Sequence, residues 1–152
     1  MSISKILTAQ GVEIPDASAP AANYVPYVQS GNLVFVSGQI PMNADGLVTG
    51  KVGEDASIED GVAAAKLCAL SLLSQVKAAC DGDIDRLRRV VKLTGFVNST
   101  PDFTDQPKVI NGASDFLVQA LGDVGRHSRS AVSAAALPFN VTVEIEGIFE
   151  IE

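Results

Sequence analysis

The chain has 152 residues, of which 47% are hydrophobic and 19% are charged, and its formal net charge at pH 7 is −7. This length fits a single domain over residues 1–152, and the composition excludes a disordered chain. The negative charge repels phosphate backbones, so we do not expect nucleic acid as a partner.

The two cysteines, Cys68 and Cys80, fall in an Ala-rich segment, and no secretory leader or bilayer-spanning apolar run is evident. We therefore expect reduced thiols, a cytoplasmic location and no membrane association. A single histidine and these two cysteines argue against a structural zinc site. No phosphate-binding glycine motif occurs either, so we expect neither a metal nor a cofactor.

Residues 1–22 are mixed in character and contain Pro15 and Pro20, which predicts a short strand or extended arm followed by a loop. Residues 32–37 then form the first clear strand. Side chains alternate along a strand, and here the residues of both parities are apolar. Both faces of this strand should therefore be covered; one face carries Leu33 and Phe35, and the other carries Val34 and Val36.

Residues 41–53 are rich in turn formers, and Asp45-Gly46 indicates a hairpin. Ser57 with Asp60 resembles a capping box, which begins a helix predicted to run to about Ala79. Its buried stripe consists of apolar residues at helical spacing, namely Ile58, Val62, Ala65, Ala69, Leu72, Leu73 and Val76.

A strand over residues 87–97, a helix over 105–121 and strands over 130–136 and 141–151 complete the chain. Two helices cannot cover both faces of the sheet that these strands would form. We therefore expect a second copy of the chain to cover the open face, which makes the protein an obligate homo-oligomer.

Two other features have simpler explanations. The segment 81–85 begins like a calcium-binding loop, but Arg86 stands where that loop needs Gly and Lys92 where it needs Glu, so a helix-to-strand turn is expected. The single histidine, His127, lies beside Arg126 in a polar loop. It could serve as a general base, but a solvated loop residue is the simpler interpretation.

Several short motifs together resemble the RidA/YjgF family, the reactive-intermediate deaminases formerly known as L-PSP endoribonucleases, and place the chain in a longer, less characterised branch. The resemblance covers nearly the whole chain, from Ala19 onward. It rests on Tyr24, Gly31-Asn32, Ser37-Gly38-Gln39-Ile40-Pro41, Phe96-Val97, Phe103, Asn111, Arg129-Ser130-Ala131-Val132, Leu137-Pro138 and Val143-Glu144-Ile145-Glu146.

This resemblance implies an α+β, chorismate-mutase-like domain: a mixed β-sheet with two helices packed on one face. It also implies a homotrimer with a ligand cleft at each subunit interface. In the family, the Arg of the R-S-x-V stretch binds the substrate carboxylate, a role that falls on Arg129. A guanidinium suits that role because it is always charged and can hold a carboxylate through two parallel hydrogen bonds.

Other roles carry over from the family in the same way. Glu144 would position the attacking water, and Tyr24 would act with it in catalysis, although Tyr27 competes for that place. Ser37 and Gly38 of the S-G-Q motif, together with Asn111, would bind the substrate. The best-studied branch often has Cys at the position of Ala131, so no thiol acts in this cleft.

The function implied is that of a 2-iminobutanoate/2-iminopropanoate deaminase-like hydrolase, which converts 2-enamine or 2-imine acids to 2-keto acids and ammonia. An imine carbon is already electrophilic, so this reaction needs orientation, a water and a proton path rather than a metal. Two alternatives stay open: a trimeric protein that binds a small carboxylate-bearing metabolite without turnover, and the endoribonuclease of the older family name. The substrate side chain is left undetermined.

Overall fold

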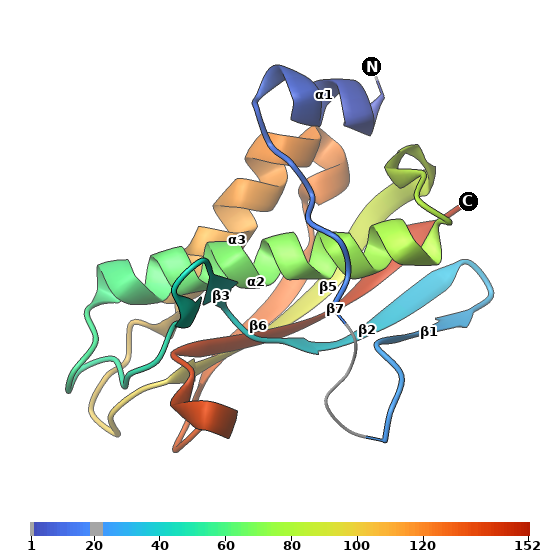
Figure 1. Ribbon diagram of the computed structural model, residues 1–152. Coiled ribbons are helices and arrows are strands. Elements are labelled where there is room, and N and C mark those ends of the chain that lie inside the picture. The colour runs from blue at the N-terminus through green and yellow to red at the C-terminus, as the bar shows by residue number, and fades with distance from the viewer. Residues whose placement is uncertain (1, 19–22) are drawn as a thin grey trace.

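The computed structural model describes residues 2–18 and 23–152 and shows a five-stranded mixed sheet covered by helices on one face (Figure 1). The five strands of the sheet lie in the order β1-β2-β7-β5-β6. All neighbouring strands are antiparallel except β5 and β6, which are parallel. The strands are β1 (Tyr27–Ser30), β2 (Leu33–Gln39), β5 (Leu87–Asn98), β6 (Ser128–Ala134) and β7 (Val143–Ile151).

The helices α2 (Ile58–Ala79) and α3 (Gln106–Leu121) pack side by side on the sheet, as the α+β prediction requires. The capping box is confirmed, because the Ser57 hydroxyl accepts from the Asp60 amide and the Asp60 carboxylate accepts from the Ser57 amide. Short 3-10 turns follow α2, α3 and β6: η1 (Ile84–Arg86), η2 (Gly122–Gly125) and η3 (Pro138–Asn140).

We expected no segment that could span a bilayer. By length and composition alone this expectation is wrong, because α2 is long and apolar enough to do so. Half of the apolar window in α2 is nevertheless buried inside the domain. Leu72, Leu73 and Val76 are completely buried in the core. The hydrophobicity of α2 is therefore that of a helix packed on a sheet.

The N-terminal prediction is also wrong: residues 3–9 form a short helix, α1 (Ile3–Ala9), in place of a strand or extended arm. Ile3 and Leu7 are buried, and the amide and hydroxyl of Ser4 both donate to the Asp85 carboxylate, at 2.8 and 2.7 Å. A helix of seven residues is marginal by itself, so these tertiary contacts decide its conformation.

The hairpin at Asp45-Gly46 is confirmed, with β3 (Met42–Asn43) pairing with β4 (Gly46–Leu47). By contrast, β1 was not expected from the sequence. The final two strands begin at Ser128 and Val143 in place of residues 130 and 141, so Arg129 lies inside β6 rather than before it.

The face of the sheet opposite the helices is open in the single chain (Figure 1). Val34 and Val36 face the helices and are buried, whereas Phe35 on the open face is 43% exposed. Val132 on β6 is 44% exposed, and it lies beside Phe96 in the register of β5 and β6. This apolar open face is the surface on which a second copy was expected.

Candidate functional site

Arg129 is the second residue of the edge strand β6, and its register partner is Leu93. Leu93 is fully buried under the helices, so the side chain of Arg129 also leaves the sheet on the helix side. There Nη1 donates to the Ser114 hydroxyl at 3.0 Å and Nη2 donates to the Pro107 carbonyl at 3.5 Å. No carboxylate of a described residue lies within 4.0 Å of the guanidinium.

Arg129 opens onto a depression of about 210 Å³ at the side of α3. The same depression is lined by Asn111, so the structure brings together two of the residues named for substrate binding. A half-buried guanidinium without an ionic partner is suited to hold an organic acid. The neighbouring amide of Asn111 can both donate and accept hydrogen bonds. The other lining residues are Ser114, Asp115, Val118, Arg126 and His127.

His127 is half-buried and fully engaged, so its interpretation as a solvated loop residue is wrong. Its Nε2 lies 2.8 Å from the Ser114 hydroxyl oxygen, and its Nδ1 lies 2.6 Å from the Gly125 carbonyl. Burial is the main cause that lowers the pKa of His127 below its ordinary value; the hydrogen bond to the Gly125 carbonyl opposes this lowering, and the charge of Arg129 adds to it. The ring is therefore neutral at physiological pH.

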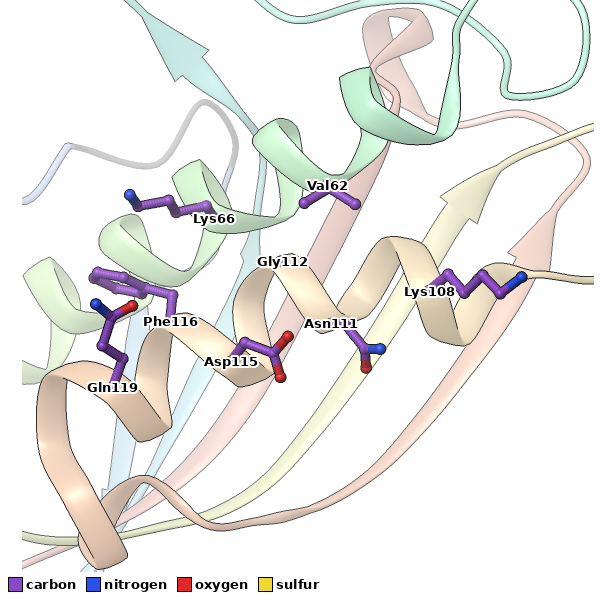
Figure 2. Close-up of a pocket in the computed structure, with 8 residues that line it drawn as sticks. All are labelled: Val62, Lys66, Lys108, Asn111, Gly112, Asp115, Phe116 and Gln119. Atoms are coloured by element: carbon purple, nitrogen blue, oxygen red, sulfur yellow. The ribbon is translucent and has the colours of Figure 1, made fainter.

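A larger depression of about 400 Å³ lies on the outer surface between α2 and α3 (Figure 2). Asn111 and Asp115 line it, but Arg129 does not. Its cationic groups are already engaged, because the Lys66 ammonium lies 5.5 Å from the centre of the Phe116 ring and Lys108 pairs with Asp105. The smaller depression is therefore the better candidate for a carboxylate ligand.

Glu144 lies on the open face of the sheet, where its register partner on β5 is Phe96. It packs directly on Gly38, since a Cβ built at Gly38 would clash with the Glu144 carboxylate. Burial first, and the neighbouring Glu146 second, raise the pKa of Glu144. A carboxyl group with a raised pKa is better able to accept and return a proton near neutral pH.

Ser37 lies beside Gly38 in the bulge where β2 leaves the regular register with β7. Its hydroxyl donates to the Val25 carbonyl at 2.9 Å, and its amide donates to the Pro26 carbonyl at 2.9 Å. The hydroxyl of Ser37 thus holds the segment that carries Tyr24. A direct role in binding substrate has no contact in the single chain to support it.

The two competing tyrosines differ in their exposure. Tyr27 pairs with the buried Val36 and packs against the core on the helix side. Tyr24 is 51% exposed and is adjacent to Val25, which Ser37 holds. Tyr24 is therefore the tyrosine that is free to meet a ligand.

The predicted site residues consequently fall into two groups on opposite faces of the sheet. Arg129 and Asn111 lie on the helix side at the β6 edge, whereas Glu144, Gly38 and Ser37 lie around the open face. Ala131 follows Arg129 on the same strand face and brings no thiol to it.

Ser114 and His127 contact Arg129 or its partner, yet Ser114 was not singled out from the sequence and His127 was considered only as a general base. The available signal was the i, i+3 spacing of Asn111 and Ser114, which places these two polar side chains on one side of α3.

Comparison with known proteins gives a consistent result. A family description, YjgF/chorismate mutase-like, which also carries the endoribonuclease label, matches residues 4–150. Protein TCP17 of Trypanosoma cruzi is 50% identical over 143 residues, which cover 93% of this chain and 89% of the relative. The 2-iminobutanoate/2-iminopropanoate deaminase of Escherichia coli strain K12 is 33% identical over 138 residues, covering 89% and 94%. The crystal structure of Atu1372, a protein of unknown function from Agrobacterium tumefaciens, is 49% identical with a TM-score of 0.89, covering 99% and 94%.

Proposed function

Because the chain belongs to the YjgF/chorismate mutase-like family, we propose that it hydrolyses 2-imine acids, and their 2-enamine tautomers, to 2-keto acids and ammonia. The E. coli relative named for this activity supports the reaction class. The observation that carries the proposal is the Arg129 guanidinium, which is half-buried and opens onto a depression shared with Asn111. Among the described residues it has no carboxylate partner.

Arg129 would hold the substrate carboxylate through charge-assisted hydrogen bonds, and Asn111 would bind a second polar atom of the substrate. Holding the acid at one end fixes where the C=N carbon lies. This orientation is the main catalytic contribution for a carbon that water already attacks readily.

Glu144 would take a proton from the water as its oxygen bonds to the carbon of the protonated imine, whose C=N electron pair moves to nitrogen and gives a neutral carbinolamine. The same carboxyl would then give this proton to the nitrogen and take the hydroxyl proton as the C=O bond forms, so that the C–N bond breaks and ammonia leaves with the 2-keto acid. The raised pKa of Glu144 favours both steps, because the group can be deprotonated for attack and protonated for departure. A 2-enamine enters the same route after protonation of its carbon 3 gives the protonated imine.

The reaction would take place at a cleft between two copies in a homotrimer. Arg129 and Glu144 leave the sheet on opposite faces, so Arg129 of one copy can meet Glu144 only of a neighbour. The open face with Phe35 and Val132 supplies the apolar surface that such a neighbour would cover. Tyr24, whose side chain is exposed, would complete the cleft.

Binding without turnover is the second candidate, because the Arg129 depression alone suffices to hold a keto acid. In that case Glu144 would affect ligand binding only through the part of the surface that its side chain covers. An RNA substrate receives less support, since the chain has a net charge of −7 and a phosphate backbone needs concentrated positive charge.

The test is a coupled assay in which an L-amino-acid oxidase generates the imine in the presence of the purified protein. Keto-acid formation should be faster than in buffer, and Arg129→Ala should lower it at least about 100-fold, the usual cost of removing one partner of a buried charged pair. Arg88→Ala is the matched control, since Arg88 binds only the Glu152 carboxylate and the Asp85 carbonyl among the described residues. Equal rates with and without protein would refute the activity. Keto-acid binding that needs Arg129 but not Glu144, with no turnover, would identify the binding protein.

A further inference from the structure

A chain of three hydrogen bonds runs from Arg129 into the protein. Arg129 Nη1 lies 3.0 Å from the Ser114 hydroxyl, that hydroxyl lies 2.8 Å from His127 Nε2, and His127 Nδ1 lies 2.6 Å from the Gly125 carbonyl. The groups come from β6, from α3 and from the segment between η2 and β6. None of these contacts follows from the family's motifs.

Chemistry fixes the direction of the two outer bonds in this chain. A guanidinium only donates, so the Ser114 oxygen accepts from Arg129. A carbonyl only accepts, so His127 carries its proton on Nδ1 and donates to Gly125. The hydroxyl proton of Ser114 is then free to point at Nε2, which accepts it through a lone pair when the ring is neutral. In this arrangement His127 is neutral and carries its proton on Nδ1.

The surroundings favour this neutral form. The lowered pKa of His127 agrees with it, because burial outweighs the opposing effect of the hydrogen bond to the Gly125 carbonyl, and the charge of Arg129 adds a weaker lowering. The other charged groups that line the depression are Asp115 from α3 and Arg126, which is exposed and pairs with Asp123. The position of the ring is also set by the backbone, because a Cβ at the buried Gly125 would clash with the Leu117 carbonyl of α3. The segment therefore lies directly against the helix that carries Ser114.

We propose that Ser114 and neutral His127 are positioning residues that aim the Arg129 guanidinium at its ligand. This inference rests on the proposed role of Arg129 as the carboxylate anchor. Without the Ser114 hydroxyl, Arg129 keeps only the long contact to the Pro107 carbonyl among its described partners. The guanidinium then samples several orientations, and this conformational entropy is lost when a carboxylate binds.

The first experiment measures the Kd of pyruvate by calorimetry and the kinetics of the coupled assay. Ser114→Ala should raise Kd and KM about tenfold, the loss expected for one hydrogen bond to a charged group, while kcat changes little. Ser114→Thr keeps the hydroxyl and should restore most of the affinity. His127→Phe should resemble Ser114→Ala, whereas His127→Gln, whose amide oxygen can accept from Ser114, should be milder.

The second experiment uses the fact that the chain has one histidine, so its ring nitrogens need no assignment in an untagged protein. Long-range ¹H–¹⁵N spectra at neutral pH should show Nδ1 protonated and Nε2 with a free lone pair. In Ser114→Ala, the Arg129 Nε–H signal, identified by its absence in Arg129→Lys, should broaden.

The two experiments separate the possible failures. If pyruvate binding does not depend on Arg129, the proposed function fails, and the histidine and arginine spectra still decide whether the chain exists. If binding needs Arg129 but Ser114→Ala leaves Kd unchanged, or if the ring carries its proton on Nε2, the positioning inference is overturned.

Discussion

Arg129 and Glu144 lie on opposite faces of one β-sheet. Arg129 is level with Leu93 on β5, and Glu144 is level with Phe96, three residues further along the same strand. Residues an odd number of positions apart on a strand point to opposite faces. The anchor for the carboxylate and the proposed proton acceptor therefore cannot act on one small ligand from within a single subunit.

This relationship predicts complementation between inactive variants. Arg129→Ala and Glu144→Gln subunits should each be inactive, but co-expression in equal amounts should restore activity. Random assembly of a closed ring places an intact Arg129 beside an intact Glu144 at about one interface in four, so about a quarter of wild-type activity is expected. The coupled deamination assay on the whole co-expressed pool, before the trimer types are separated, measures it. No recovery in mixed trimers verified by mass spectrometry would mean that each site lies within one subunit.

Glu144→Gln should stabilise the fold at neutral pH while it abolishes turnover. The pKa of Glu144 is raised above its ordinary value of 4.5, so the folded state favours the protonated carboxyl. The stability that this group contributes is fully present below about pH 4.5 and is lost as the pH rises through the folded-state pKa. Gln stays neutral throughout. Because the group is partly exposed, we expect a gain below about 1 kcal/mol at neutral pH and none at about pH 4, measured by urea unfolding.

Gly38→Ala should impair catalysis by displacing Glu144. The new methyl group would clash with the Glu144 carboxylate, which must rotate away, while the backbone of Gly38 has no conformation that requires glycine. We expect kcat to fall about tenfold or more, with a small change in stability. In a Glu144→Ala background the same substitution should have no further effect on the residual rate. Additive losses in the double variant would place the cause elsewhere.

Charges on the open face should prevent assembly. Phe35→Asp and Val132→Asp each put a carboxylate on the apolar surface that a neighbouring copy would have to bury, which costs several kcal/mol when the charge is unpaired. Sedimentation velocity should then show folded monomers at micromolar concentration, where the wild type is expected to be a trimer. Ala63→Asp, at an exposed position of α2, is the matched control and should remain assembled. A wild-type chain that is itself monomeric would remove the basis of the shared cleft.

The sequence alone was sufficient to predict the elements that depend on residues close together in the chain. The capping box of Ser57 and Asp60 and the helical stripe over residues 58–79 depend on residues within a few positions of one another, so the helix was found almost to its ends. The apolar character of both parities in residues 32–37 correctly indicated apolar side chains on both faces of the sheet, with Phe35 exposed on the open face of the single chain. The short motifs likewise located Arg129 and Glu144, because their residue types can be read without knowing their surroundings.

The tertiary structure decided what depends on partners distant in the chain. Parity within a strand says which residues share a face, but only the register of β5 with β6 and β7 places Arg129 and Glu144 on opposite faces. The helix at residues 3–9 exists because Ser4 meets Asp85, 81 positions away. The sequence alone predicts a loop residue at His127. In the structure, the close packing of Gly125 on α3 places the His127 ring against Ser114. Each of these outcomes is set by long-range packing, whose energy no local pattern of residues contains.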